Sequence, residues 1–271
     1  GMLSGVVALV TAGAIAVGIA IITHAVVLTL QMRAALPARF APLVRYYVAA
    51  SVVFLGGIAL GSLMPVFPAM ADRFVTAHII LNAYGWIGLT AFGTLVLLWP
   101  TVLHARMPDT ADAAARHALP ILVAGLLIAA TGPLVNVQPL ITLGMVVWLA
   151  GASLLAIEAA NEWRAMPPGT FAGWSLAAAF VWVVIAGIAL GVQALTAPDW
   201  ASLRADYLMV LGPLVVGFAV QLLTGAMSYL LPVVALGSPA AAKAGAEVLD
   251  RGAAFRVAAF NGAVALYLVP L

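Results

Sequence analysis

Long runs of apolar residues alternate along this chain with short polar segments. Eight runs approach or exceed the length that a helix needs to cross a bilayer, about 20 apolar residues at about 1.5 Å rise each. They cover 5–30, 42–66, 76–100, 118–135, 138–160, 171–195, 207–236 and 253–271. Only helices and closed barrels satisfy their backbone polar groups in lipid, and unbroken apolar runs of this length indicate helices. The pattern predicts an all-α, polytopic membrane helix bundle of about eight transmembrane helices, with the lipid bilayer as its surroundings.

Basic residues are distributed unevenly between the two ends of these predicted helices. Nine of the eleven lie on one side: Arg33, Arg39, Arg45, Arg106, Arg116, Arg164, Lys243, Arg251 and Arg256. Only Arg73 and Arg204 lie on the other side. Because cytoplasmic loops carry the excess of Lys and Arg, we expect an integral membrane protein with both termini extracytoplasmic. The basic residues are then topology signals and contacts with anionic lipid, so no nucleic-acid partner is expected.

The chain also repeats itself. Gly57-Ile-Ala-Leu-Gly61 in the second run recurs in the sixth as Gly187-Ile-Ala-Leu-Gly191, 130 residues later. Further matches at an offset of 132 residues pair Gly85 with Gly217, Gly93 with Gly225 and Pro100 with Pro232. We therefore expect one integral membrane domain, 1–271, built from two parallel four-helix repeats, 1–136 and 137–271. Both Gly-Ile-Ala-Leu-Gly segments are small-xxx-small motifs, which favour close helix packing.

The polar residues narrow the function classes. Cysteine is absent, which excludes thiolate metal sites, iron–sulfur clusters and covalently attached c-type haem. The carboxylates fall in predicted loops or near helix ends. Proton pumps and ion-coupled transporters usually need ionisable groups along the pathway, so this distribution counts against those two classes.

Histidine supplies the candidate chemistry. His78, Asn82 and Gly85 are spaced by four and three residues and therefore share one helix face. An imidazole, an amide and a glycine in one stripe suit an axial haem ligand, with the glycine leaving room for the macrocycle. The alternative is an interfacial histidine that bonds a neighbouring helix, with Gly85 serving packing. His104 and His117 are expected to be solvated interfacial residues.

Further candidates are His24, Arg73 and two methionines. His24 lies three quarters of the way along the first run and is a second candidate metal ligand. Helix rise separates it from His78 by roughly 20–25 Å, so the two histidines cannot hold one haem. Arg73 either pairs with a haem propionate or contacts lipid headgroups. Met64 and Met70 precede His78 and could bind Cu(I) with it, although methionine is also an ordinary apolar gap-filler.

A family resemblance rests on the segments 78–107, 36–50 and 221–232. They resemble the membrane domain of bacterial multicopper-oxidase or copper nitrite reductase-type fusion proteins. More distantly, the chain is similar to haem–copper membrane proteins associated with nitric oxide stress. His78 and Asn82 match the family's His-x-x-Leu-Asn element, and His24 matches a histidine late in the preceding helices.

The resemblance implies a redox platform in a bacterial cell membrane. Such a platform binds haem b, with copper as a further metal, and passes electrons from quinol to an extracytoplasmic copper protein or domain. The last predicted helix exits on the outer side, where that partner belongs. Two other hypotheses stay open: a permease or channel for copper or a small uncharged solute, and a metal-free membrane anchor. Whether the chain is an enzyme is left open too.

Overall fold

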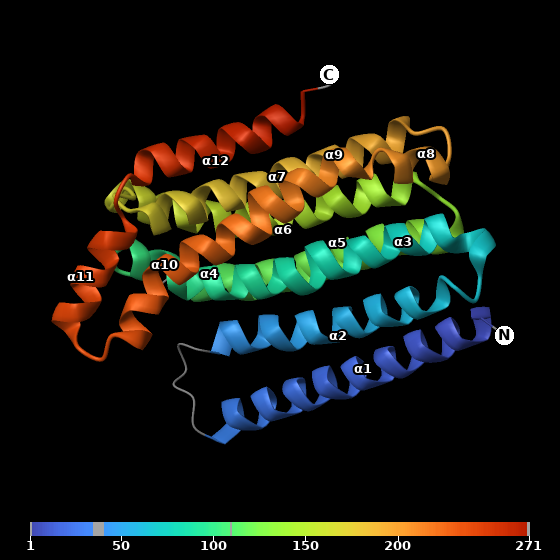
Figure 1. The fold of residues 1–271 in the computed structure, drawn as a ribbon, viewed down its shortest axis with the longest axis horizontal. Coiled ribbons are helices and arrows are strands. Elements are labelled where there is room, and N and C mark those ends of the chain that lie inside the picture. Colours follow the sequence, from blue (N-terminus) through green and yellow to red (C-terminus); the bar gives the residue numbers. More distant parts are fainter. Residues whose placement is uncertain (1, 35–40, 109, 270–271) are drawn as a thin grey trace.

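The fold is all-α, as predicted. A computed structural model describes residues 2–34, 41–108 and 110–269, and every regular element within these ranges is helical. Seven helices of the described part are long and apolar enough to cross a membrane. Figure 1 shows the long helices running side by side, with the N-terminus and α8 at one end of the bundle and α11 at the other. These features confirm the prediction of a polytopic membrane bundle.

The elements are α1 (Met2–Ala34), α2 (Ala41–Leu63), η2 (Pro68–Met70), α3 (Ala71–Ile79), η3 (Ile80–Ile87), α4 (Gly88–Leu103), α5 (Ala111–Val135), α6 (Pro139–Ala165), α7 (Phe171–Thr196), α8 (Trp200–Ala205), α9 (Tyr207–Leu211), η4 (Gly212–Val220), α10 (Gln221–Ala235), α11 (Pro239–Leu249) and α12 (Ala253–Tyr267). The third span joins η2, α3, η3 and α4, and the seventh joins α9, η4 and α10.

Two segments differ from the sequence-based expectation. The predicted eighth helix, 253–271, is the 15-residue α12, about 22 Å long and shorter than a bilayer core of about 30 Å. The predicted loop 237–252 contains α11, whose N-terminus is capped by the Ser238 hydroxyl, which accepts a hydrogen bond from the Ala241 N–H. Arg39 lies outside the described residues, as do the last two positions of the predicted eighth helix.

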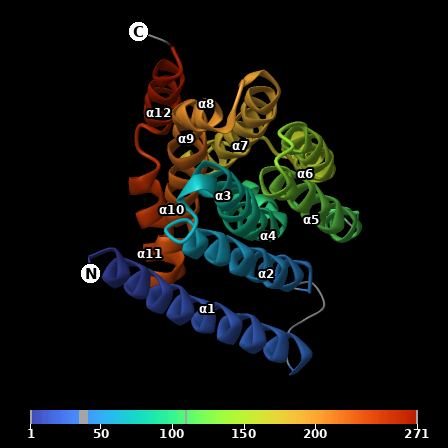
Figure 2. The same ribbon diagram turned by 90° about the vertical axis from the view of Figure 1, so that its right-hand side faces the viewer.

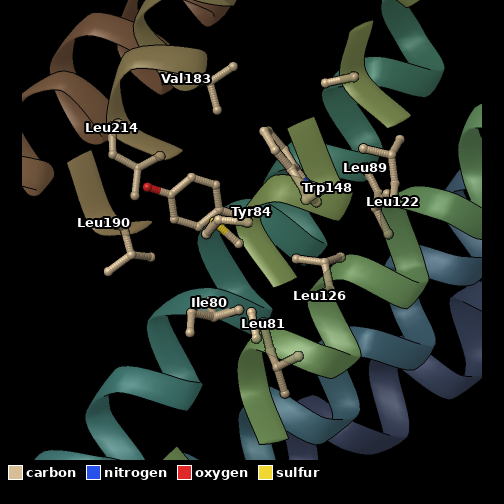
Figure 3. Close-up of a cluster of buried hydrophobic side chains, with 14 of the residues drawn as sticks. Ile80, Leu81, Tyr84, Leu89, Leu122, Leu126, Trp148, Val183, Leu190 and Leu214 are labelled. Atoms are coloured by element: carbon tan, nitrogen blue, oxygen red, sulfur yellow. The ribbon is translucent and has the colours of Figure 1, made fainter. Parts of the chain in front are cut away.

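The buried core lies between η3, α4, α5, α6 and α7. Tyr84 projects from η3 towards Leu190 and Leu214 (Figure 3). Its ring meets that of Trp148 on α6 edge to face, with ring centroids 5.5 Å apart. By contrast, α1 lies at the edge of the bundle against α2 (Figure 2), and none of its most apolar stretch is buried. Most of α1 is therefore available to lipid.

Helices α5 and α6 form the closest pair in the bundle. A Cβ atom at Gly125 would lie 2.5 Å from the backbone nitrogen of Trp148, and one at Gly144 would overlap the backbone of Ala129. Glycine therefore lets the two backbones approach, as small residues do in membrane helix pairs. The contact joins the last helix of the predicted first repeat to the first helix of the second.

Both η3 and η4 are π-helical, and their first residues are 132 positions apart. Within these turns, Gly85 lies against Val53 of α2 and Gly217 against Trp182 of α7. The matched glycines Gly93 and Gly225, eight residues further along the chain, repeat this arrangement. Gly93 lies against Tyr46 of α2, and Gly225 lies against Ser175 of α7. Each irregular helix thus approaches the corresponding neighbour through equivalent glycines. These correspondences support the internal repeat, which stays a prediction.

The Gly-Ile-Ala-Leu-Gly segments do not share surroundings in the same way. Gly57 borders Asn82, whereas Gly187 borders Leu149, Trp148 and Tyr84. The residues that meet the matched glycines indicate an offset of 129 between α2 and α7, since Tyr46 corresponds to Ser175 and Val53 to Trp182. The two Gly-Ile-Ala-Leu-Gly segments match at an offset of 130, which differs by one residue from the offset of 129 that the packing contacts give.

Candidate functional site

His78 lies in the last turn of α3, half-buried against α2. Its Nδ1 atom is 2.8 Å from the carbonyl oxygen of Gly57. A carbonyl oxygen can only accept, so Nδ1 carries the proton and donates it. The other ring nitrogen, Nε2, is then the unprotonated one, and it makes no hydrogen bond to a described residue. This is the arrangement in which a histidine can bind a metal through Nε2.

Asn82 supports the same turn and leaves one polar atom without a partner. Its amide nitrogen donates to the His78 carbonyl oxygen at 2.9 Å. Its Oδ1 is buried and receives no hydrogen bond from the described residues. A Cβ atom at Gly57 would lie 2.5 Å from this oxygen, and one at Gly61 would lie 3.1 Å from the His78 ring. The two glycines of α2 therefore make room for Asn82 and His78.

Gly85 is packed rather than open. A Cβ atom there would overlap the Val53 side chain of α2 and lie 3.6 Å from Leu126 of α5. His78, Asn82 and Gly85 do share one helix face, but that face packs against α2. The space that the sequence assigned to a macrocycle beside Gly85 is occupied by side chains of α2 and α5.

His24 lies on an exposed face of α1. It follows Gly18, whose Cβ position meets Leu55 of α2. Helices α1 and α2 run in opposite directions (Figure 1), so His24 lies beside the part of α2 that precedes Leu55. His78, in contrast, contacts α2 at Gly57 and Gly61, which follow Leu55. The structure therefore does not bring the two histidines together. Among the described residues, no group of three or more His, Asp or Glu side chains could hold a metal ion.

Arg73 is engaged with the end of another helix. Its Nε donates to the Pro133 carbonyl oxygen at 2.5 Å and its Nη2 to that of Leu134 at 2.6 Å. These carbonyls belong to the last turn of α5, where helical carbonyls lack intrahelical partners and attract positive charge. The guanidinium thus caps α5. Arg204 of α8 pairs with Asp72 of α3 at 2.6 Å.

The remaining candidates are part of the packing or of the surface. Met64 and Met70 are partly buried and pack against the main apolar cluster. His104 ends α4 in the left-handed conformation, with φ 55°, and its side chain is exposed. His117 is exposed on α5.

A cavity that the sequence did not indicate lies between α4, α6 and α7. Its volume is about 640 Å³, and Trp99, Trp163 and Trp174 line it together with Glu158 and Glu162. The three tryptophans come from the ends of three separate helices. The sequence does show that these tryptophans lie near the ends of predicted helices, and this position could have indicated a shared site. Only the fold shows that the three helix ends meet. The cavity is separate from His78, which lies towards the opposite end of the bundle.

Comparison with known proteins yields no relative. No protein-family model matches the chain, and no curated protein or solved structure matches it. The likeness to multicopper-oxidase membrane domains therefore rests on the sequence motifs alone and stays a prediction.

Proposed function

We propose that this chain is a membrane redox platform that binds haem b through His78 and passes electrons from quinol to an extracytoplasmic copper protein. The observation that carries the proposal is the hydrogen bond from His78 Nδ1 to the Gly57 carbonyl oxygen. It fixes the tautomer and leaves Nε2 for a metal, as a hydrogen bond from the other ring nitrogen does in many metal-binding histidines. A neutral imidazole is also cheaper to bury than a carboxylate ligand. Haem bound there supplies one-electron transfer.

The fit restricts where a haem can lie. Because α2 and α5 fill the space beside Gly85, that glycine would not contact the haem, and His78 would hold the group through Nε2. Asn82 then acts as a positioning residue, since its amide holds the His78 backbone. Arg73 is occupied by α5, so its place in the proposal is to hold the scaffold rather than a propionate.

The same packing favours a second function, a metal-free membrane anchor. In this alternative, the bond from His78 to Gly57 only joins α3 to α2, and the filled space beside Gly85 is simply a helix contact. The two functions differ in whether His78 binds a chromophore, which a visible spectrum can decide.

We expect His78→Ala to abolish the reduced α-band of a b-type haem, because it removes the iron ligand. The variant should still insert and purify, since the lost hydrogen bond to Gly57 contributes only about 1 kcal/mol. His117→Ala is the matched control, because His117 is exposed on α5, and its spectrum should equal that of the unmodified chain. A His78→Ala protein that keeps the α-band removes His78 from the site.

We also propose that the N-terminus and α8 lie on the extracytoplasmic side, on the basis of the basic residues at the other end of the bundle. The expected extracytoplasmic C-terminus depended on an eighth spanning helix, and α12 is too short to cross the bilayer core. The chain has no cysteine, so single-cysteine variants give clean labelling. In intact cells, a membrane-impermeant maleimide should label Ala201→Cys but neither Ala165→Cys nor Ala244→Cys; all three positions are exposed. Labelling at Ala165→Cys or Ala244→Cys from outside would invert the proposed orientation.

A further inference from the structure

The cavity between α4, α6 and α7 has the size and lining of a ligand site. Its volume of about 640 Å³ falls within the roughly 300–1,000 Å³ of small-molecule pockets. Most of its lining residues are apolar, and its charged residues are Glu158, Glu162 and Arg164. It lies at the end of the bundle that carries the predicted cytoplasmic loops, because its lining includes the last turns of α4 and α6 and the first turns of α7. An occupant would therefore sit near one surface of the membrane.

Aromatic rings form one wall of this cavity. The ring centroids of Trp99 and Trp163 are 6.1 Å apart, and those of Trp163 and Trp174 are 5.1 Å apart. Tryptophans commonly sit at membrane interfaces, but Trp99 is only 6% exposed and thus faces the protein interior. Its indole N–H donates to the Ala159 carbonyl oxygen, whereas no described residue accepts from Trp163 or Trp174. The wall offers flat apolar faces and two free donors.

Glu162 is a carboxyl group in the cavity lining that has no partner among the described residues. Its residue is 5% exposed and lines the cavity. Its side chain makes no hydrogen bond or ion pair with a described residue, while the neighbouring Glu158 accepts a hydrogen bond from the Thr110 hydroxyl at 2.8 Å. The guanidinium of Arg164 is exposed and donates to Asn161. A buried carboxyl without a partner is costly, so an occupant that hydrogen-bonds to Glu162 would be stabilised.

We infer that this cavity binds the ring of a membrane quinone, with the ring against the indoles of Trp163 and Trp174 and a ring carbonyl oxygen that accepts a hydrogen bond from the protonated Glu162 carboxyl. A quinone ring is flat and apolar and carries oxygens at its edge, which matches the indole wall and the single unpartnered carboxyl. Two carboxyl groups beside one engaged arginine disfavour a phospholipid phosphate. The choice of a quinone rests on the proposed redox function, whereas the site and its recognition chemistry rest on the cavity alone.

The test uses the full chain in quinone-free phospholipid nanodiscs and a short-tailed azidoquinone as the probe. After irradiation, cross-links should map to cavity-lining residues of α4, α6 or α7, and unlabelled quinone should displace them. Ala156→Phe fills the cavity, and Glu162→Leu removes the carboxyl. Each should weaken quinone binding about tenfold or more, since one lost hydrogen bond or blocked contact is worth about that factor. Ala150→Phe places the same bulk on the exposed face of α6 and should leave binding unchanged.

Either of two results would overturn the site: cross-links confined to lipid-facing residues, or an Ala156→Phe protein that elutes and binds quinone like the unmodified chain. Its failure is separable from that of the redox function, because His78→Ala should lose haem absorbance and keep quinone binding. A haem-free chain that still binds the probe in the cavity would leave the site standing and remove the redox function. A haem-loaded chain whose cavity binds only phospholipid would remove the quinone site and leave the redox function standing.

Discussion

Gly144→Leu is expected to destabilise the bundle by about 3 kcal/mol, the upper end of what overpacking costs. Any side chain at Gly144 meets the backbone of Gly125 and Ala129 on α5, which cannot swing aside as a flexible side chain would. The α5–α6 contact must then open along its length. Because this contact also joins the two predicted repeats, the damage should spread to both halves.

The measurement is thermal unfolding of the detergent-solubilised protein, followed by size-exclusion elution. Gly13→Leu is the matched control, because a Cβ atom at Gly13 on α1 has nothing within 4 Å. The control should elute and unfold like the unmodified chain, while Gly144→Leu should unfold several degrees lower or aggregate. Equal unfolding temperatures for the two variants would mean that α5 and α6 are not packed backbone to backbone.

Arg73→Leu is expected to cost about 1.5–3 kcal/mol, the range for hydrogen bonds that involve a charged group. The substitution leaves the Pro133 and Leu134 carbonyl oxygens at the end of α5 without their donors. Arg73→Lys should recover only part of the loss, because an ammonium cannot reproduce the planar two-pronged contact. Thermal unfolding without added haem reports this role directly, since a residue needed only for a propionate would not affect the haem-free protein.

The control for Arg73 is Arg164→Leu. Arg164 is exposed and its recorded hydrogen bond is to the exposed Asn161, so its removal should change stability by less than about 0.5 kcal/mol. If Arg73→Leu unfolds at the same temperature as Arg164→Leu, the cap on α5 is not a stabilising contact.

The fold was largely predictable because the bilayer imposes a minimum length on each apolar run. The ends of the helices were less predictable. The run 76–100 became a span from Pro68 to Leu103, because the span also includes η2 and the amphipathic start of α3, which carries Asp72 and Arg73. The π-helical turns η3 and η4 were not predictable, because a segment that is apolar on most faces shows no change of period when its hydrogen bonding changes.

The site was predictable in part. The spacing of His78, Asn82 and Gly85 correctly placed them on one face, but it could not show that this face lies on α2. The glycines that receive His78 and Asn82 were visible as a packing motif, yet their partner depends on how α2 and α3 fold back on each other. His24 was ambiguous because α1 is apolar all round, so no pattern distinguished its lipid side from its protein side.

The dithionite-reduced minus oxidised absorption spectrum of the purified, unmodified chain tests the central claim most directly. If His78 binds haem, the spectrum should show the α-band of a b-type haem, at a haem content that rises with haem supplementation during expression. A chain that purifies folded but colourless and metal-free, even after haem supplementation, would contradict the redox platform and leave the membrane anchor.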